Sequence, residues 1–178
     1  MSEVESNPMK DFGIPTIVLT LICTICTAAM VCTYQITKPI IDINTKAAAD
    51  AARAEVYTGV AGFEQIDVSG LENCAEAYKT TGGEGYVFTT DGKGFDGAIT
   101  VMTAIAQDGT IVGVKVLEHG ETPGLGSRAT EAAYLEQYIG MGSDLSGVEY
   151  IAGATYSGRG VDAAVAAAFE AFESVKGQ

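Results

Sequence analysis

Two loops of this sequence hold the residues best suited to chemistry. The first covers residues 118–126 and the second residues 149–160. In the second loop, Gly153 and Ala154 precede the hydroxyl residue Thr155, just upstream of an expected helix. Small residues leave room for a bulky planar group, and unpaired backbone N–H groups at a helix N-terminus bind phosphate. Arg159 is placed to neutralise part of a phosphate's charge. An arginine that is exposed to water is also stable without a ligand, so this residue alone does not indicate a phosphate site.

The first loop contains a near match to a dinucleotide-binding fingerprint. Gly124 and Gly126 are followed by Ala129, and Asp144 lies twenty residues after the first glycine. That fingerprint requires glycines directly after a strand of a parallel βαβ unit. Pro123 and several polar residues intervene here, and the preceding strands are expected to be antiparallel. An NAD-binding domain is therefore the less favoured alternative. A loop whose glycines only allow positive φ explains the pattern more simply.

Other catalytic and metal-binding arrangements are not favoured. No G-x-S-x-G elbow surrounds Ser157, and the single histidine, His119, has no necessary proximity to it. One histidine and one cysteine outside the N-terminal apolar run make a zinc or iron site improbable. Cys23 and Cys26 have C-x-x-C spacing within the apolar run, where small helix-packing residues are the better interpretation. We expect no catalytic residue and no metal site.

An uncharged run at the N-terminus predicts a membrane anchor. Residues 12–37 carry no charge and are long enough to cross a bilayer as a helix. A secretory signal peptide would have a shorter apolar region and an A-x-A-like cleavage site, so an uncleaved anchor is favoured. We expect a tail at 1–12 and a transmembrane helix at 13–37. The few lysines on either side do not fix its orientation.

The rest of the chain predicts an α+β domain. A connecting helix is expected at 38–60, followed by the domain at 61–178. Within the domain, strands are expected at 86–88, 98–106 and 110–117, and helices at 127–138, with Ser127 as its N-cap, and at 161–175. Asp108 and Gly109 form the turn dipeptide most favoured in tight hairpins, which predicts an antiparallel sheet flanked by helices.

The charge distribution limits the range of partners. The net charge is −13, and beyond residue 41 there are 20 acids against 8 bases. Such a domain repels nucleic acid and anionic lipid headgroups, while basic docking surfaces on proteins remain compatible with it. We therefore expect no nucleic-acid partner.

The two loops resemble a known flavoprotein family. Residues 114–126, with the core Leu-Glu-His-x-Glu-Thr-Pro-Gly-Leu-Gly, and residues 148–161 are similar to the FMN-binding domain of the Rnf complex G subunit and of the C subunit of sodium-pumping NADH:quinone oxidoreductase. The segment 94–114 and the order of anchor and domain are similar too. Chain length and the form of the first loop favour the Rnf G subunit over the C-type subunit.

The resemblance implies a covalent flavin. In that family, a flavin transferase joins FMN through its phosphate to the threonine of a Ser/Thr-Gly-Ala-Thr motif, which corresponds to Thr155. Ala152 stands where Ser or Thr is usual and Glu149 where Asp is common, but the acceptor hydroxyl is retained. The implied cofactor-binding set adds Glu121, Thr122, Leu125, Gly126, Gly153, Ala154, Ser157 and Arg159.

The implied function is electron transfer within a membrane complex. The subunit would pass electrons through FMN between neighbouring subunits, without turning over a substrate alone, in a complex that couples ferredoxin oxidation to Na⁺ or H⁺ translocation. The resemblance places the N-terminus in the cytoplasm and the FMN domain on the outer face of the cell membrane. A flavin-free, membrane-anchored scaffold module is the alternative from a different class.

Overall fold

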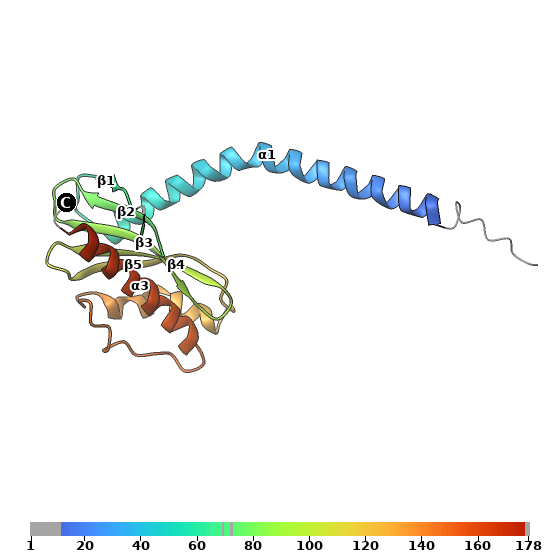
Figure 1. The fold of residues 1–178 in the computed structure, drawn as a ribbon. Coiled ribbons are helices and arrows are strands. Elements are labelled where there is room, and N and C mark those ends of the chain that lie inside the picture. Colours follow the sequence, from blue (N-terminus) through green and yellow to red (C-terminus); the bar gives the residue numbers. More distant parts are fainter. Residues whose placement is uncertain (1–11, 69, 72, 177–178) are drawn as a thin grey trace, which may run out of the picture. The chain divides into compact units, whose positions relative to one another are not determined.

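The computed structural model of the chain describes residues 12–68, 70–71 and 73–176. The chain divides into two compact units, Met1–Ala47 and Ala48–Gln178. The predicted N-terminal tail lies outside the described residues except for Phe12. The domain contains five strands and a long C-terminal helix (Figure 1), so the predicted α+β class is confirmed.

The N-terminal helix α1 covers Ile14–Val56 and combines the predicted membrane and connecting helices. It continues through Pro39 and ends four residues before the predicted boundary at residue 60. Among the described residues it is the single helix long and apolar enough to cross a membrane. Thr16, Thr20, Thr24 and Thr33 each donate a hydrogen bond to the carbonyl four residues earlier. Their hydroxyls are therefore satisfied within an apolar helix.

The sheet is an antiparallel meander in the order β1-β2-β3-β4-β5. The strands are β1 (Phe63–Ile66), β2 (Cys74–Thr80), β3 (Gly85–Lys93), β4 (Ala98–Ala106) and β5 (Ile111–His119). The predicted hairpin between β4 and β5 is confirmed, with Gly109 at φ +89° and Asp108 accepting a hydrogen bond from the Thr110 amide. A wholly antiparallel sheet excludes the dinucleotide alternative, because that fingerprint needs a parallel βαβ unit.

Helix α3 (Thr155–Val175) covers one face of the sheet (Figure 1). Side chains alternate between the two faces of a strand, so Tyr86 and Phe88 pack in the core cluster beneath α3. The intervening residue Val87 instead packs with Ala52 and Val56 of α1 on the opposite face. Both faces of β3 are therefore buried inside the domain.

The segment predicted as a helix at 127–138 is three short pieces: η2 (Gly126–Thr130), α2 (Ala132–Leu135) and η3 (Glu136–Tyr138). The prediction of one helix is wrong because Glu131 adopts an extended conformation between the first two pieces. Ser127 is not an N-cap. Leu125 occupies that position for η2 and makes no side-chain cap, while Ser127 Oγ accepts a hydrogen bond from the Gly124 amide at 2.9 Å.

Candidate functional site: the start of helix α3 and two adjoining loops

Helix α3 begins earlier than predicted, and this changes the position of Thr155. The helix starts at Thr155 rather than at residue 161, so the hydroxyl residue lies within its first turn and not upstream of it. Gly158 and Gly160, which are poor helix formers, account for the difference. A Cβ on Gly160 would lie 2.9 Å from Gly94 Cα, so this glycine allows α3 to pack closely against the end of β3.

The N-terminus of α3 has the features of an anion-binding site. The capping residue Ala154 makes no side-chain hydrogen bond to the helix. The first N–H groups of any helix lack intrahelical partners and carry partial positive charge, which favours a phosphate there. The Thr155 side chain is half-buried and so accessible to modification, and Arg159 is exposed one turn further along.

The Gly-Ala pair before Thr155 gives this turn its shape. Gly153 has a φ of +85°, a conformation that strongly favours glycine. A Cβ on Gly153 would lie 3.2 Å from Leu125 Cδ1, so the second loop is in contact with the first. Ala154 is buried, and Leu125 is half exposed. Leu125 and Thr155 are therefore both partly open to solvent beside this turn.

Glu121 connects the parts of the site through a buried carboxylate. It is 4% exposed. Its Oε1 atom accepts hydrogen bonds from the backbone amides of Phe95, at 2.8 Å, and Asp96, at 3.2 Å. Its Oε2 atom accepts a hydrogen bond from Ser157 Oγ at 2.5 Å. One carboxylate thus joins the β3–β4 loop, the loop after β5 and the first turn of α3.

The other predicted site residues lie around this carboxylate. A Cβ on Gly126 would clash with the Glu121 carboxylate and lie 2.7 Å from Ser157 Oγ, so only glycine fits there. Thr122 is exposed, and its carbonyl accepts hydrogen bonds from the amides of Leu125 and Ser127 at 3.2 Å each. All the predicted cofactor-binding residues therefore belong to two loops and one helix start that contact one another.

Two aromatic residues at this site were not among the predicted site residues. Phe95 and Tyr156 are 72% and 69% exposed, and their ring centroids are 6.4 Å apart. Phe95 belongs to the Gly94–Gly97 segment that carried part of the resemblance, but its meeting with Tyr156 depends on tertiary structure. The only local signal was an aromatic residue directly after Thr155.

A pair of tyrosines attaches the segment before α3 to that helix. Tyr138 and Tyr150 both donate hydrogen bonds to the carboxylate of Asp162. Burial raises the pKa of Tyr138, and the hydrogen bond to Asp162 adds to this effect. For Tyr150, the hydrogen bond to Asp162 is the main cause of a raised pKa. Both hydrogen bonds are made by neutral phenols. They tie the two ends of the segment 139–149 to Asp162 of α3.

His119 and the possible metal ligands are two further features of the sequence that the structure describes. His119 is exposed at the end of β5, and its Nδ1 atom accepts a hydrogen bond from the Glu121 amide at 3.3 Å. Within the described part of the chain, no group of three or more His, Cys, Asp and Glu residues could hold a metal ion.

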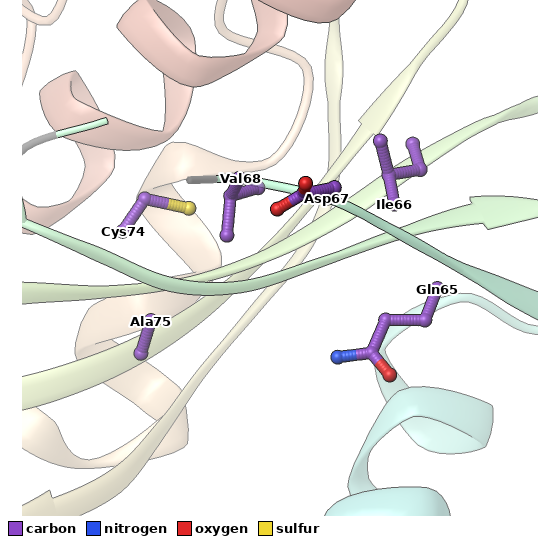
Figure 2. Close-up of a pocket in the computed structure, with 6 residues that line it drawn as sticks. All are labelled: Gln65, Ile66, Asp67, Val68, Cys74 and Ala75. Atoms are coloured by element: carbon purple, nitrogen blue, oxygen red, sulfur yellow. The ribbon is translucent and has the colours of Figure 1, made fainter. Parts of the chain in front are cut away.

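A pocket at the edge of the sheet is separate from the site. It is open, has a volume of about 630 Å³, and lies beside β1 and β2 (Figure 2). Its lining consists of Gln65, Ile66, Asp67, Val68, Cys74 and Ala75. Burial raises the pKa of the Cys74 thiol, which lowers its reactivity. None of the predicted site residues lines this pocket.

Comparison with known proteins identifies the class of this domain. Residues 94–170 match the family described as the FMN-binding domain. This segment runs from the β3–β4 loop to the middle of α3 and includes every residue of the site described above. This segment of the chain is therefore similar to FMN-binding domains.

Several curated proteins similar to this chain are G subunits of ion-translocating oxidoreductase complexes. It is 38% identical to the G subunit of the ion-translocating oxidoreductase complex of Cereibacter sphaeroides over 90 residues, which cover 51% of this chain and 33% of the relative. It is 29% identical to the G subunit of the Na(+)-translocating ferredoxin:NAD(+) oxidoreductase complex of Acetobacterium woodii over 140 residues, covering 70% and 67%. The G subunit of the corresponding proton-translocating complex of Clostridium ljungdahlii is 24% identical over 162 residues, covering 85% and 86%. The chain thus spans about a third of the length of the first of these relatives and most of the other two.

Proposed function

We propose that this chain is the FMN-carrying electron-transfer subunit of a membrane-bound, ion-translocating ferredoxin oxidoreductase complex. Its FMN is joined through the phosphate to Thr155. The observation that carries the proposal is the position of this hydroxyl: it is accessible, it lies in the first turn of a helix without a side-chain cap, and it lies inside a matched FMN-binding domain. The named relatives are all G subunits, which disfavours the C-type alternative.

Each part of the site has a defined role in this proposal. The free N–H groups of α3 and the Arg159 guanidinium bind the phosphate, and Gly153 and Ala154 leave space for the ester linkage. Thr122, Leu125 and Gly126 line the side of the first loop that faces the cofactor. Bound FMN supplies the one-electron and two-electron redox chemistry. The protein holds the flavin in place and excludes part of the surrounding water.

The proposal extends to the membrane and to protein partners. Helix α1 anchors the chain, with the N-terminus in the cytoplasm and the FMN domain on the outer face. The partners are the other subunits of the complex, and a flavin transferase loads the FMN. One named relative belongs to a proton-translocating complex and another to a sodium-translocating complex, so both coupling ions occur among relatives. Digestion of spheroplasts with an impermeant protease tests the topology, because the proposal requires the FMN domain to be cleaved.

Flavin attachment is tested on the full chain co-expressed with a flavin transferase. Denaturing electrophoresis should give a flavin-fluorescent band, and mass spectrometry should find one FMN less a water on the peptide containing Thr155. Thr155→Ala should abolish the band, whereas Thr155→Ser should retain it because the hydroxyl remains. Thr58→Ala is the matched control, since it removes an exposed threonine outside the site and should leave the band intact.

The outcomes distinguish the proposed function from its alternative. A chain without any flavin after co-expression would support the flavin-free scaffold. A band that persisted in Thr155→Ala and vanished in Ser157→Ala would contradict the acceptor assignment. That result is not expected, because the Ser157 side chain is buried and already donates its hydrogen bond to Glu121.

A further inference from the structure

Phe95 and Tyr156 form an exposed aromatic pair beside the proposed attachment residue. Phe95 comes from the β3–β4 loop and Tyr156 from the first turn of α3. Their ring planes are inclined at 60°, with the centroids 6.4 Å apart. Single exposed apolar side chains are ordinary, but two large rings in contact, both more than two-thirds exposed, mark a binding surface. Neither residue belongs to the core clusters of the domain.

The backbone holds this pair in a fixed position. Tyr156 directly follows Thr155 on the helix. The Phe95 amide is bound to Glu121, which also accepts the hydrogen bond of Ser157 from the same turn of α3. Both rings are therefore attached to the structure that carries the acceptor hydroxyl. A surface arranged in advance loses little conformational entropy when a ligand binds to it.

We propose that Phe95 and Tyr156 are the residues that hold the isoalloxazine ring of the FMN. This inference rests on the proposed attachment at Thr155. The isoalloxazine ring is planar, aromatic and electron-poor, and such rings stack on aromatic faces or meet aromatic edges. The inclined pair offers both contacts. Leu125, which is half exposed against Gly153, lies on the first-loop side of the attachment residue and is the competing support for the ring.

Time-resolved fluorescence anisotropy of the covalently bound flavin in the full-length holoprotein tests this proposal. A ring held by the protein rotates with it, whereas a ring released on its ribityl tether rotates faster. We expect Phe95→Leu and Tyr156→Leu each to lower the ratio of held to free flavin about fivefold, the equivalent of one aromatic contact. Tyr156→Phe should restore the wild-type anisotropy, because it keeps the ring and removes only the hydroxyl. Phe63→Leu, the same change in a half-buried residue on β1, is the matched control and should have no effect.

Loading and ring contact are measured separately. In-gel fluorescence of the denatured variants reports attachment alone, so it should be unchanged in all of them. A wild-type chain without in-gel fluorescence would refute the proposed function itself. Normal loading with unchanged anisotropy in both leucine variants would overturn only the ring assignment. The assignment would also be overturned if Leu125→Ala, and neither aromatic variant, released the ring.

Discussion

The buried carboxylate of Glu121 gives the sharpest prediction for stability. It accepts three hydrogen bonds, from the Phe95 amide, the Asp96 amide and Ser157 Oγ. Each bond to a charged group contributes about 1.5–3 kcal/mol net. Glu121→Ala leaves the buried Ser157 hydroxyl unpaired. Water replaces some of the hydrogen bonds that the Phe95 and Asp96 amides lose. We therefore expect the free energy of unfolding to fall by about 3–4 kcal/mol, among the larger effects of single substitutions.

Two further variants separate the hydrogen bonds from the charge. Glu121→Gln keeps a carbonyl oxygen for the two amides and directs an NH₂ group at Ser157, whose hydroxyl then accepts. Its expected cost is about 1–2 kcal/mol, because the bonds remain but lose their charge assistance. Glu118→Ala, an exposed glutamate near the end of β5, should change stability by less than about 0.5 kcal/mol.

Urea titration of the full chain in detergent, followed by tyrosine fluorescence and circular dichroism, measures these differences. The same samples should show that Glu121→Ala loses flavin loading and that Glu121→Gln retains most of it. If Glu121→Ala were as stable as Glu118→Ala, the carboxylate would not join the three segments, and the reasoning would fail.

Three other substitutions test the packing of the domain, each by the same urea titration. Gly160→Ala should destabilise the protein by about 1–3 kcal/mol although alanine is the better helix former, because the new methyl group would meet the Gly94 backbone; a stabilised variant would contradict the close packing of α3. Burial and the bond to Asp162 keep the Tyr138 pKa above its ordinary 10.0, so the unfolded chain releases this proton first as the pH rises. The free energy of unfolding should consequently fall above about pH 10, and Tyr138→Phe should reduce that slope by up to about 1.4 kcal/mol per pH unit; an unchanged slope would refute this. Arg53→Lys should cost about 1–2 kcal/mol, because the buried guanidinium lies 3.9 Å from the centroid of the Tyr78 ring and an ammonium group cannot stack in the same way; an equally stable variant would show that the charge alone matters.

Much of the fold could be predicted because its signals are local. The uncharged run predicts a helix long enough to cross a membrane whatever it packs against, and α1 agrees with this. The Asp-Gly dipeptide specifies a tight turn by its own backbone preferences, and β4 and β5 pair across it. The motif residues around Thr155 could be proposed from sequence for the same reason, since they lie in two continuous segments.

The missed elements depend on contacts between distant segments. Strands β1 and β2 were not predicted, because β1 is short and both strands mix charged residues with half-buried apolar ones. The early start of α3 was missed because Gly158 and Gly160 have low helix propensity. At Gly160 the compensation is the close approach of the helix to the end of β3, and at Gly158 it is the close approach of Tyr134 and Tyr150. No local pattern reveals either contact. The Phe95–Tyr156 pair was missed for the same reason.

Charge gives a physical reason for the ester bond that we propose at this site. The part of the chain beyond residue 41 has 20 acids against 8 bases, so its overall field repels a free phosphate monoester. A monoester carries close to two negative charges at neutral pH. Esterification to Thr155 leaves one, within reach of the positive end of α3 and of Arg159. The N-terminus of α3 and Arg159 then balance one negative charge instead of two. The covalent bond holds the FMN in place without a need for high binding affinity. An acidic domain can in this way retain an anionic cofactor that its net charge would otherwise disfavour.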